Sequence, residues 1–511
     1  MQRLFIDNFT VSGLMRLTLK AIAAGMLCLC ITAASHAAEY YVAPDGNNSG
    51  AGGRHSPWRS IGFALRHANP GDTVYLREGR YNEAVHMPHS GSRGHGMITL
   101  RNYPFETAVI DGTGLYVNHG EQGLVTIADR SHVRIQGLHL TNFHSDDESV
   151  PMGIFVTGAG ENIELIDNHI SAIETRKAGC DGNALGIAVY GRRSDAPLRD
   201  IRIAGNEVSH LKTGCSESMS INGNVTDFEI VGNSVHDNNN IGIDVIGHEG
   251  MARDPAVDIA RNGVIADNIV YNITSAANSA YPDGEMAAGG IYVDGGYNIV
   301  IERNRVFASD MGIELASEHA GKATRNVLVR NNLIYNNHRV GLSIGGYAPD
   351  VGGTVDCRIV HNTFYKNDTA MSWGGEVVIQ YNARDNVFEN NIVYANAQAV
   401  FINYYVESTE RPLTSDRNLF YTEAGRYAGQ WQWRGKHYDD MSGYARVSGN
   451  DGSSLFGHPR KVSARFVPDF ARRQQTGPRV VPRGHGEGAL RDTGYAAAAA
   501  GTSDFGAYEY Y

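Results

Sequence analysis

A short strand that ends in asparagine recurs through the middle of the chain, and this repeat limits the possible folds more than any other feature. Most copies are about thirty or about thirty-five residues apart, which is too few for independent domains. Short apolar runs and polar turns fill the intervals and favour strands over helices. The copies end at Asn168, Asn206, Asn233, Asn268, Asn304, Asn332, Asn362 and Asn391. This pattern predicts a parallel coil in which each turn stacks on the last.

The repeated asparagines suit the bends of such a coil. Asparagine tolerates left-handed backbone angles and bonds to nearby backbone groups. Stacked asparagine amides can also bond to each other along the coil axis. We therefore assign these residues a structural role and no chemistry.

Short segments near both ends of the chain resemble those of a known protein family. The segments Tyr40–Gly46, Gly71–Leu76, Ile98–Tyr103 and Val109–Gly112 resemble the N-terminal cap and first coils of secreted right-handed β-helix proteins, notably the family 9 polysaccharide lyases. The C-terminal segment Asp504–Tyr510 is similar to the end of the same proteins. The resemblance implies an all-β, single-stranded right-handed parallel β-helix with N- and C-terminal caps.

Four regions are expected along the chain. Residues 1–37 are predicted to be a signal peptide, residues 38–115 the N-terminal cap and first coils, residues 116–402 the β-helix core, and residues 403–511 the C-terminal capping region. The cap would cover the strand edges that an open coil end exposes.

The N-terminus has the pattern of an export signal, with Met15 as an alternative start. Arg16 and Lys20 precede the apolar run Ala21–Ala34, and small residues follow. We expect cleavage after Ala37, with a cut one residue later as the second choice. The apolar run is too short for a stable membrane span. The sequence thus predicts a secreted or periplasmic protein with no membrane span, which we expect to be a monomer.

The formal net charge of the 511-residue chain is -11. A nucleic-acid partner is therefore not expected, because phosphate binding needs a basic surface. Cys180 and Cys215 lie in corresponding loops of adjacent repeats, so they could pair or remain two free thiols. Cys357 stands at a strand start and is expected to be a small buried hydrophobic residue.

A second repeated strand begins with glycine and alternates apolar and other residues. The copies Gly242–Ile246, Gly290–Asp294 and Gly312–Ala316 follow this pattern, which sends the Ile, Val and Leu side chains to one face. The other face, predicted to be exposed, then carries acidic and aromatic residues. Those singled out are Asp244, Tyr292, Asp294 and Glu314, together with Tyr190 and Asn222 from earlier copies. Such a face is typical of a sugar-binding groove, with Tyr190, Asn222 and Tyr292 as substrate-binding residues.

The spacing of the carboxylates favours acid–base chemistry. Asp294 and Glu314 would be roughly 8 Å apart, and Asp244 and Glu314 roughly 9.6 Å apart. Inverting glycosidases place their two carboxyl groups about 6.5–9.5 Å apart, with a water between them. An inverting glycoside hydrolase is therefore one interpretation. Alternatively, Asp244, Asp294 and Glu314 could hold a hard cation, for which Ca²⁺ is the candidate.

The resemblance to family 9 lyases implies a different reaction, β-elimination on a uronate-containing polysaccharide with a divalent cation and a basic residue. The groove strands carry no Lys or Arg at the outward positions, so the base is sought in the flanking loops. His319 and Lys322 are the catalytic candidates there, and Arg253 is a substrate-binding candidate. A third interpretation is a non-catalytic polysaccharide-binding or envelope-assembly protein on the same scaffold.

Overall fold

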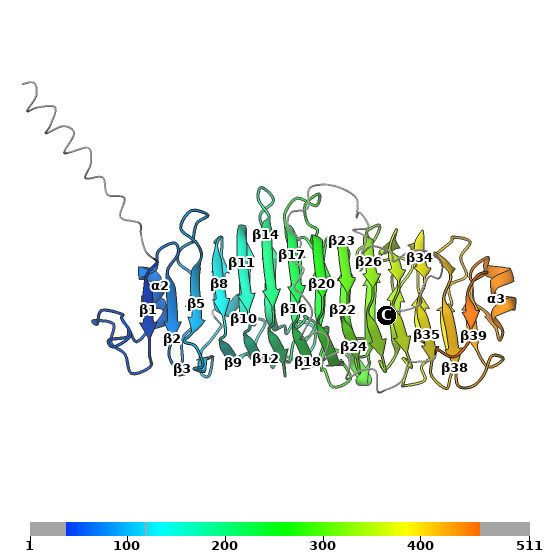
Figure 1. The fold of residues 1–511 in the computed structure, drawn as a ribbon, viewed down its shortest axis with the longest axis horizontal. Helices are drawn as coiled ribbons and strands as arrows, with labels where there is room; N and C mark the ends of the chain where they lie inside the picture. Colours follow the sequence, from blue (N-terminus) through cyan, green and yellow to red (C-terminus); the bar gives the residue numbers. More distant parts are fainter. Residues whose placement is uncertain (1–36, 118–119, 460–511) are drawn as a thin grey trace, which may run out of the picture. The chain divides into compact units, whose positions relative to one another are not determined.

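The structure is a computed structural model that describes residues 37–117 and 120–459. The expected signal peptide, apart from its last residue, and the C-terminal segment Asp504–Tyr510 lie outside these residues. Three sheets of parallel strands, one of which ends in an antiparallel pair, wind around one interior, and almost every turn of the chain adds one strand to each sheet. Successive coils lie side by side in sequence order, from β1 (Glu39–Val42) and α2 (Ile61–His67) to β39 (Gln430–Trp433) and α3 (Met441–Ser448) (Figure 1). The predicted all-β, right-handed parallel β-helix is therefore confirmed.

In the described part of the chain, sheet 1 holds fifteen strands. They are β1 (Glu39–Val42), β2 (Thr73–Leu76), β5 (Ile98–Asn102), β8 (Val133–Gln136), β11 (Gly160–Ile166), β14 (Leu198–Ala204), β17 (Val225–Val231), β20 (Arg261–Ala266), β23 (Tyr297–Glu302), β26 (Ala323–Arg330), β29 (Gly353–Val355), β30 (Arg358–Val360), β33 (Ala383–Arg384), β34 (Asn386–Glu389) and β37 (Leu413–Asp416).

Sheet 2 follows sheet 1 in each coil. Its strands are β3 (Gly79–Tyr81), β6 (Ala108–Asp111), β9 (His139–Ser145), β12 (His169–Thr175), β15 (Glu207–Ser209), β18 (Ser234–Asn238), β21 (Ile269–Ile273), β24 (Arg305–Phe307), β27 (Leu333–Tyr335), β31 (Thr363–Tyr365), β35 (Ile392–Ala395), β38 (Leu419–Thr422) and β41 (Leu455–Phe456).

Sheet 3 completes each coil and carries the glycine-led strands. Its strands are β4 (Val85–His86), β7 (Glu121–Ala128), β10 (Val150–Gly158), β13 (Leu185–Gly191), β16 (Met219–Gly223), β19 (Ile243–Ile246), β22 (Gly289–Asp294), β25 (Met311–Ala316), β28 (Val340–Ile344), β32 (Val377–Ile379), β36 (Val400–Tyr404), β39 (Gln430–Trp433) and β40 (Lys436–Tyr438). The described helical segments are α2 (Ile61–His67), η1 (Pro282–Gly284) and α3 (Met441–Ser448).

The interior of the coil is built from columns of aliphatic side chains, as the alternation predicts. In sheet 3, Ile243 pairs with Ile291, which pairs with Ile313. All three are fully buried and belong to one core cluster that runs through the described coils. Because every coil covers its neighbour, each of these side chains gains about 1.5–3 kcal/mol by leaving water.

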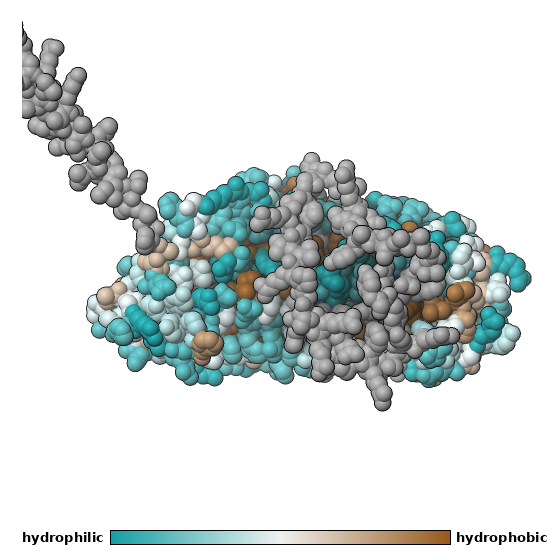
Figure 2. All heavy atoms as spheres, in the orientation of Figure 1, coloured by the Kyte–Doolittle hydropathy of each residue, from teal (hydrophilic) through white to brown (hydrophobic). Residues whose placement is uncertain are grey.

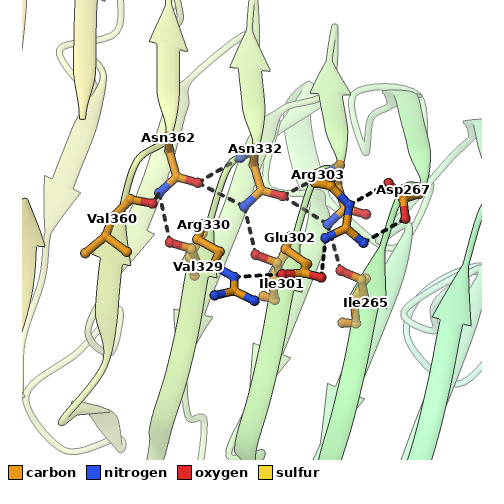
Figure 3. A network of polar contacts seen from close by, with 11 residues as sticks. Ile265, Asp267, Ile301, Glu302, Arg303, Val329, Arg330, Asn332, Val360 and Asn362 are labelled. Carbon is orange, nitrogen blue, oxygen red and sulfur yellow. Dashed lines mark hydrogen bonds and ion pairs between the residues drawn. The ribbon is translucent and has the colours of Figure 1, made fainter. Parts of the chain in front are cut away.

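The repeated asparagines form a ladder at the turn between sheets 1 and 2. The backbone N–H of Asn304 donates to Asn332 Oδ1 at 2.9 Å, and Asn304 Nδ2 donates to the same oxygen at 3.0 Å and to Ile265 O at 2.8 Å. Asn332 bonds to Asn362 in the same way (Figure 3). The predicted structural role of these residues is confirmed.

The left-handed backbone position differs from the expectation. It belongs to the residue before each ladder asparagine, such as Asp267 with φ 59° and Arg303 with φ 56°. The asparagine itself is thereby aimed inward, where its amide serves the ladder. Arg303 in turn bonds to Asp267 and Glu302 on the outer side of sheet 1 (Figure 3).

Cys180 and Cys215 form a disulfide, which settles the alternative that the sequence leaves open. Cys357 is a buried free thiol, as expected. Among the described residues, no helix has the length and apolar character needed to cross a membrane. On the side shown in Figure 2, hydrophilic residues cover most of the described surface, with smaller hydrophobic areas between them. The boundaries of the expected caps stay predictions.

Candidate active site on sheet 3

Strand register places the predicted carboxylates on one face of sheet 3. Asp244 on β19 pairs with Tyr292 on β22, and Tyr292 pairs with Glu314 on β25. Asp294, two residues after Tyr292, pairs with Ala316. The two columns therefore have the alignment expected from the sequence.

Two further predicted residues stand on the same face, one coil or two coils earlier. Asn222 on β16 pairs with Tyr190 on β13. Tyr190 packs in a small apolar cluster with Phe155 and Met152, separate from the main core. The acidic part of the face is thus bordered by an aromatic part on its N-terminal side.

The expectation of an exposed face is wrong for most of these side chains. Asp244 is 2% exposed, Asp294 3% and Tyr292 5%. Loops after the strands fold onto the face: the backbone N–H of Glu318 donates to Asp294 Oδ1 at 2.8 Å. A Cβ built on Gly295 would lie 3.0 Å from His248 Cδ2, so this histidine packs beside the end of β22.

Two buried aspartates hold the loops in place. Asp258 accepts hydrogen bonds from the N–H groups of Gly250 (2.6 Å) and Ala252 (2.8 Å) in the loop after β19. Asp310 accepts from the N–H groups at both ends of the next insertion, Ser275 (2.8 Å) and Ala288 (3.2 Å). Both insertions are therefore fixed to the coil.

Three carboxylates join the predicted ones. We define the acidic site as the six side chains Glu217, Asp244, Glu249, Asp294, Glu314 and Glu318. Glu249 and Glu318 come from the loops after β19 and β25 and are exposed, whereas Glu217 precedes β16 and is partly buried. Asn222 Nδ2 donates to Glu249 Oε2 at 2.8 Å, which ties the first loop to the face.

Glu217 could have been found from the sequence. It stands two residues before Met219, which pairs with Ile187, and the corresponding residue two before Ile187 is Leu185. A glutamate in a column that is otherwise apolar is a signal of function. The positions of Glu249 and Glu318 depend on loop conformation, which no period in the sequence reports.

Burial and mutual repulsion keep protons on the acidic site. Burial, then the charge of Glu249, raises the pKa of Glu217 to about 8. Burial raises the pKa of Glu314 to about 7, against a hydrogen bond from Ser343 that lowers it. Burial raises the pKa of Asp244 well above its usual range, and the charges of Glu217 and Asp294 add to this. At neutral pH the site therefore contains neutral carboxylic acids that can donate protons.

Several buried polar atoms of the site have no hydrogen-bond partner. They include Asp244 Oδ1, Asn222 Oδ1 and His248 Nδ1. Buried polar atoms normally find partners, so these are available to a ligand. In the described part of the chain, none of the six carboxyl groups of the acidic site forms an ion pair with Lys, Arg or His.

The ligand atoms closest to one another are those of Glu249, Asp294 and His319, which lie within 4.8 Å of one another. The metal set predicted from the sequence shares only Asp294 with this group. Asp244 and Glu314 stand in one column with Tyr292 between them, roughly 9.6 Å apart along the backbone. Their role as metal ligands stays a prediction.

The remaining candidates lie on the loops. Lys322 is exposed, and its charge contributes to the lowered pKa of His248 after burial, so the two side chains are neighbours. His319 is partly buried and acts on His248 in the same way. Arg253 is exposed in the loop after β19. The structure thus brings His319 and Lys322 to the edge of the acidic site.

A surface hollow also lies on the first coils, lined by residues that include Asn69, His89 and Arg130. Its lining contains no carboxylate, and it lacks the paired acids that catalysis of sugar cleavage needs. The acidic site is therefore the stronger candidate.

Comparisons with known proteins agree with the fold. Residues 40–184 match the family "Pel9A-like, right handed beta helix region", and residues 152–364 match "Right handed beta helix region". The uncharacterized protein YwoF of Bacillus subtilis is 41% identical over 421 residues, covering 82% of this chain and 87% of YwoF. Pectate lyase PEL9 of Emericella nidulans is 27% identical over 172 residues, or 31% of this chain and 40% of that protein.

Among solved structures, pectate lyase Pel9A is similar over 94% of this chain and 98% of its own, with 14% identity and a TM-score of 0.39. The extent and identity of the match to YwoF are sufficient to define a family. The chain belongs, with YwoF, to the right-handed β-helix proteins related to polysaccharide lyases.

Proposed function

We propose that this protein is an exported enzyme that cleaves a polysaccharide at the acidic site. The observation that carries the proposal is the group of carboxylic acids whose pKa values lie near neutrality, at about 7 for Glu314 and about 8 for Glu217. Cleavage of a glycosidic bond requires a proton for the leaving oxygen, and such acids supply one. The pectate lyase among the relatives supports a polysaccharide substrate.

The first form of the proposal is a lyase that acts on a uronate-containing polymer. A base removes the proton at C5 of the uronate and the C4–O bond breaks. The electron pair leaves with the oxygen, which takes a proton, and a double bond forms between C4 and C5. Lys322 is the candidate base and Glu314 the candidate acid. Neutral Asp244 and Glu217 would donate hydrogen bonds to the substrate carboxylate where ionised groups would repel it.

The family of lyases implies Ca²⁺ at such a site, and the closest ligands fit it poorly. Ca²⁺ takes six to eight oxygen ligands, whereas one of the three close groups is the imidazole of His319. We therefore assign no step of the elimination to Ca²⁺.

The second form is an inverting glycoside hydrolase. Asp294 and Glu314 stand on adjacent strands and two positions apart, roughly 8 Å between backbones, a spacing that suits an acid and a base with a water between them. Glu314 would protonate the leaving oxygen, and Asp294 in its ionised form would take a proton from the attacking water. Burial and the charge of Glu318 raise the pKa of Asp294 well above its usual range, so this form needs a pH above that range. A neutral polysaccharide would then be the substrate.

One assay distinguishes these forms. The purified protein is incubated with polyuronates and with neutral polysaccharides, and both ultraviolet absorbance and new reducing ends are measured. Absorbance from the C4–C5 double bond indicates the lyase, and reducing ends without it indicate the hydrolase. Binding without turnover on any polymer would contradict both and favour the non-catalytic, polysaccharide-binding or envelope-assembly interpretation.

Two variants assign the roles. Glu314→Gln should abolish most activity in either form, because it removes the transferable proton. Lys322→Ala should abolish turnover by a lyase and leave most of the turnover of a hydrolase. Glu229→Gln is the matched control, since Glu229 lies on the outer face of sheet 1 in an ion pair with Arg202. Equal losses in Glu314→Gln and the control would contradict the assignment of the site.

A further inference from the structure

We propose that Glu249, Asp294 and His319 form a binding site for a divalent transition metal. The inference deepens the proposed function, because it names a cofactor class for the same face, but it stands on ligand geometry and can be tested without turnover. The three ligand atoms lie within 4.8 Å of one another. In a tetrahedral or trigonal site, metal bonds of about 2.0–2.2 Å put the ligand atoms roughly 3.3–3.8 Å apart, so binding needs the three ligand atoms to draw together by up to about 1–1.5 Å.

Three successive coils supply the three ligands. Glu249 belongs to the loop after β19, Asp294 is the last residue of β22, and His319 belongs to the loop after β25. Asp294 is buried at the end of a paired strand, so its position is fixed by the coil. The site is therefore built on the scaffold and only completed by the loops.

Hydrogen bonds around the ligands orient them, as metal sites require. Asn222 Nδ2 donates to Glu249 Oε2 at 2.8 Å, and the N–H of Glu318 donates to Asp294 Oδ1 at 2.8 Å. The N–H of Lys322 donates to His319 O at 2.9 Å and closes the turn that carries the histidine. The two carboxylates are thus held by hydrogen bonds from outside the trio, and the backbone that carries His319 is held in its turn.

An independent observation also points to a cation. Asp244 Oδ1 and Asn222 Oδ1 are buried oxygens without a hydrogen-bond partner, on side chains only 2% exposed. Asn222 contacts Glu249 directly, and the charges of Asp294 and Glu249 both act on Asp244. Within residues 37–117 and 120–459, no lysine or arginine forms an ion pair with the trio's carboxylates. A cation would offset the cost of holding so many acceptors together.

The donor set selects the class of metal. Two carboxylates and one imidazole suit Zn²⁺, Mn²⁺ or Fe²⁺, whereas Ca²⁺ and Mg²⁺ prefer oxygen ligands alone. Three protein ligands also leave a coordination position open, which is the arrangement of catalytic sites rather than of closed structural sites.

The test uses the chelator-treated full-length protein and Zn²⁺ as the probe in isothermal titration calorimetry. We expect one equivalent of Zn²⁺ per chain, and an affinity more than about tenfold weaker in Asp294→Asn and in His319→Ala. The exposed His86 on β4, outside the site, provides the control variant His86→Ala, which should bind Zn²⁺ as the wild type does. Thermal melting of each apo variant checks that it is folded.

Co²⁺ provides a second readout, because its visible spectrum reports nitrogen ligation. The spectrum should change on binding to the wild type and to His86→Ala, and not on binding to His319→Ala. Equal Zn²⁺ affinity in His319→Ala and His86→Ala, or a Co²⁺ spectrum that is the same in both, would overturn the proposal. Failure to bind metal would leave polysaccharide cleavage standing, and inactivity toward every polysaccharide would leave the metal site standing.

Discussion

The asparagine ladder and the acidic site are both rows of buried polar side chains, but their hydrogen bonding is opposite. In the ladder, Asn304 uses its backbone N–H, both functions of its amide, and three neighbours. On sheet 3, Asn222 makes one side-chain hydrogen bond, to Glu249, while its own oxygen and an oxygen of Asp244 have no partner. The side-chain hydrogen bonds of asparagine are thus all made in the ladder, whereas on sheet 3 the oxygen of Asn222 has no partner.

The difference in hydrogen bonding indicates a structural role for the ladder and a functional role for the acidic site. A buried polar group that is fully bonded stabilises the fold, whereas one left without a partner costs about 1–3 kcal/mol. Proteins retain such costs where a ligand or a reaction needs the group. The coil therefore gains stability from the ladder and loses some of it at the acidic site.

The largest effect is expected for Asp294→Asn, which keeps the shape of the side chain and removes its charge. If Asp294 is the base of the hydrolase form, activity should fall about 10²–10⁴-fold, because the variant loses proton-transfer capacity. The melting temperature should stay the same or rise, since a buried carboxylate among like charges no longer has to be accommodated. Activity assays and thermal melting measure the two quantities. A large drop in melting temperature would show that Asp294 has a structural role, as the ladder asparagines do.

Two asparagine variants compare the rows directly. Asn304→Ala leaves the backbone N–H and one amide N–H of Asn268 without an acceptor and removes the donor of Ile265 O, so it should cost about 2–5 kcal/mol of unfolding free energy. Asn222→Ala removes one bond to the exposed Glu249 and should cost less than about 1 kcal/mol.

Urea unfolding of both variants and the wild type gives these values. Similar costs for the two substitutions would show that the rows do not differ in the way that their hydrogen bonds indicate.

The ladder and the core could be predicted from the sequence because both depend on local period. A residue at every second position of a strand is fixed to one face, so the alignment of Asp244, Tyr292 and Glu314 follows from the pattern alone. Asn332 could likewise be assigned to a stacked turn, although the left-handed residue proved to be its predecessor.

The proximity of Glu249, Asp294 and His319 could not be predicted, because it depends on loop conformation. Glu249 and His319 follow different strands, and their approach to Asp294 is set by hydrogen bonds such as those from two loop N–H groups to Asp258. Burial of the face was missed for the same reason: alternation tells which side of a strand a residue occupies, but not what folds over it.

The next effect is a pH dependence of stability. Burial raises the pKa of Glu314 to about 7 in the folded protein, above its usual 4.5. Its contribution to stability is therefore full below about pH 4.5 and is lost as the pH rises through about 7. Relative to Glu314→Gln, which cannot titrate, the wild type should lose up to about 2–3 kcal/mol across this interval.

Melting temperatures of the wild type and Glu314→Gln between pH 4.5 and 8 test this expectation. The melting temperature of the wild type should fall relative to that of Glu314→Gln as the pH rises, and the difference should level off above about pH 7. A constant difference across the interval would mean that Glu314 ionises in the folded protein as it does in water. The difference between the wild type and a ladder variant such as Asn304→Ala should not change with pH, because both contain Glu314 and asparagine does not titrate.

The smallest effect is expected from Ser343→Ala, which removes the hydrogen bond that Ser343 donates to the Glu314 side chain. Ser343 Oγ donates to Glu314 Oε1 at 3.3 Å, and this bond favours the ionised form. Without it, the pKa of Glu314 should rise further by a fraction of a unit. If Glu314 is the proton donor, the alkaline limb of the pH–rate profile should move to higher pH by the same fraction, with little change in the maximal rate.

Ser209→Ala on sheet 2 is the matched control, since Ser209 is also a buried strand serine and lies outside the acidic site. An alkaline limb that stays in place in Ser343→Ala would assign that limb to another acid of the site, and Glu217, whose pKa burial raises to about 8, would be the next residue to substitute.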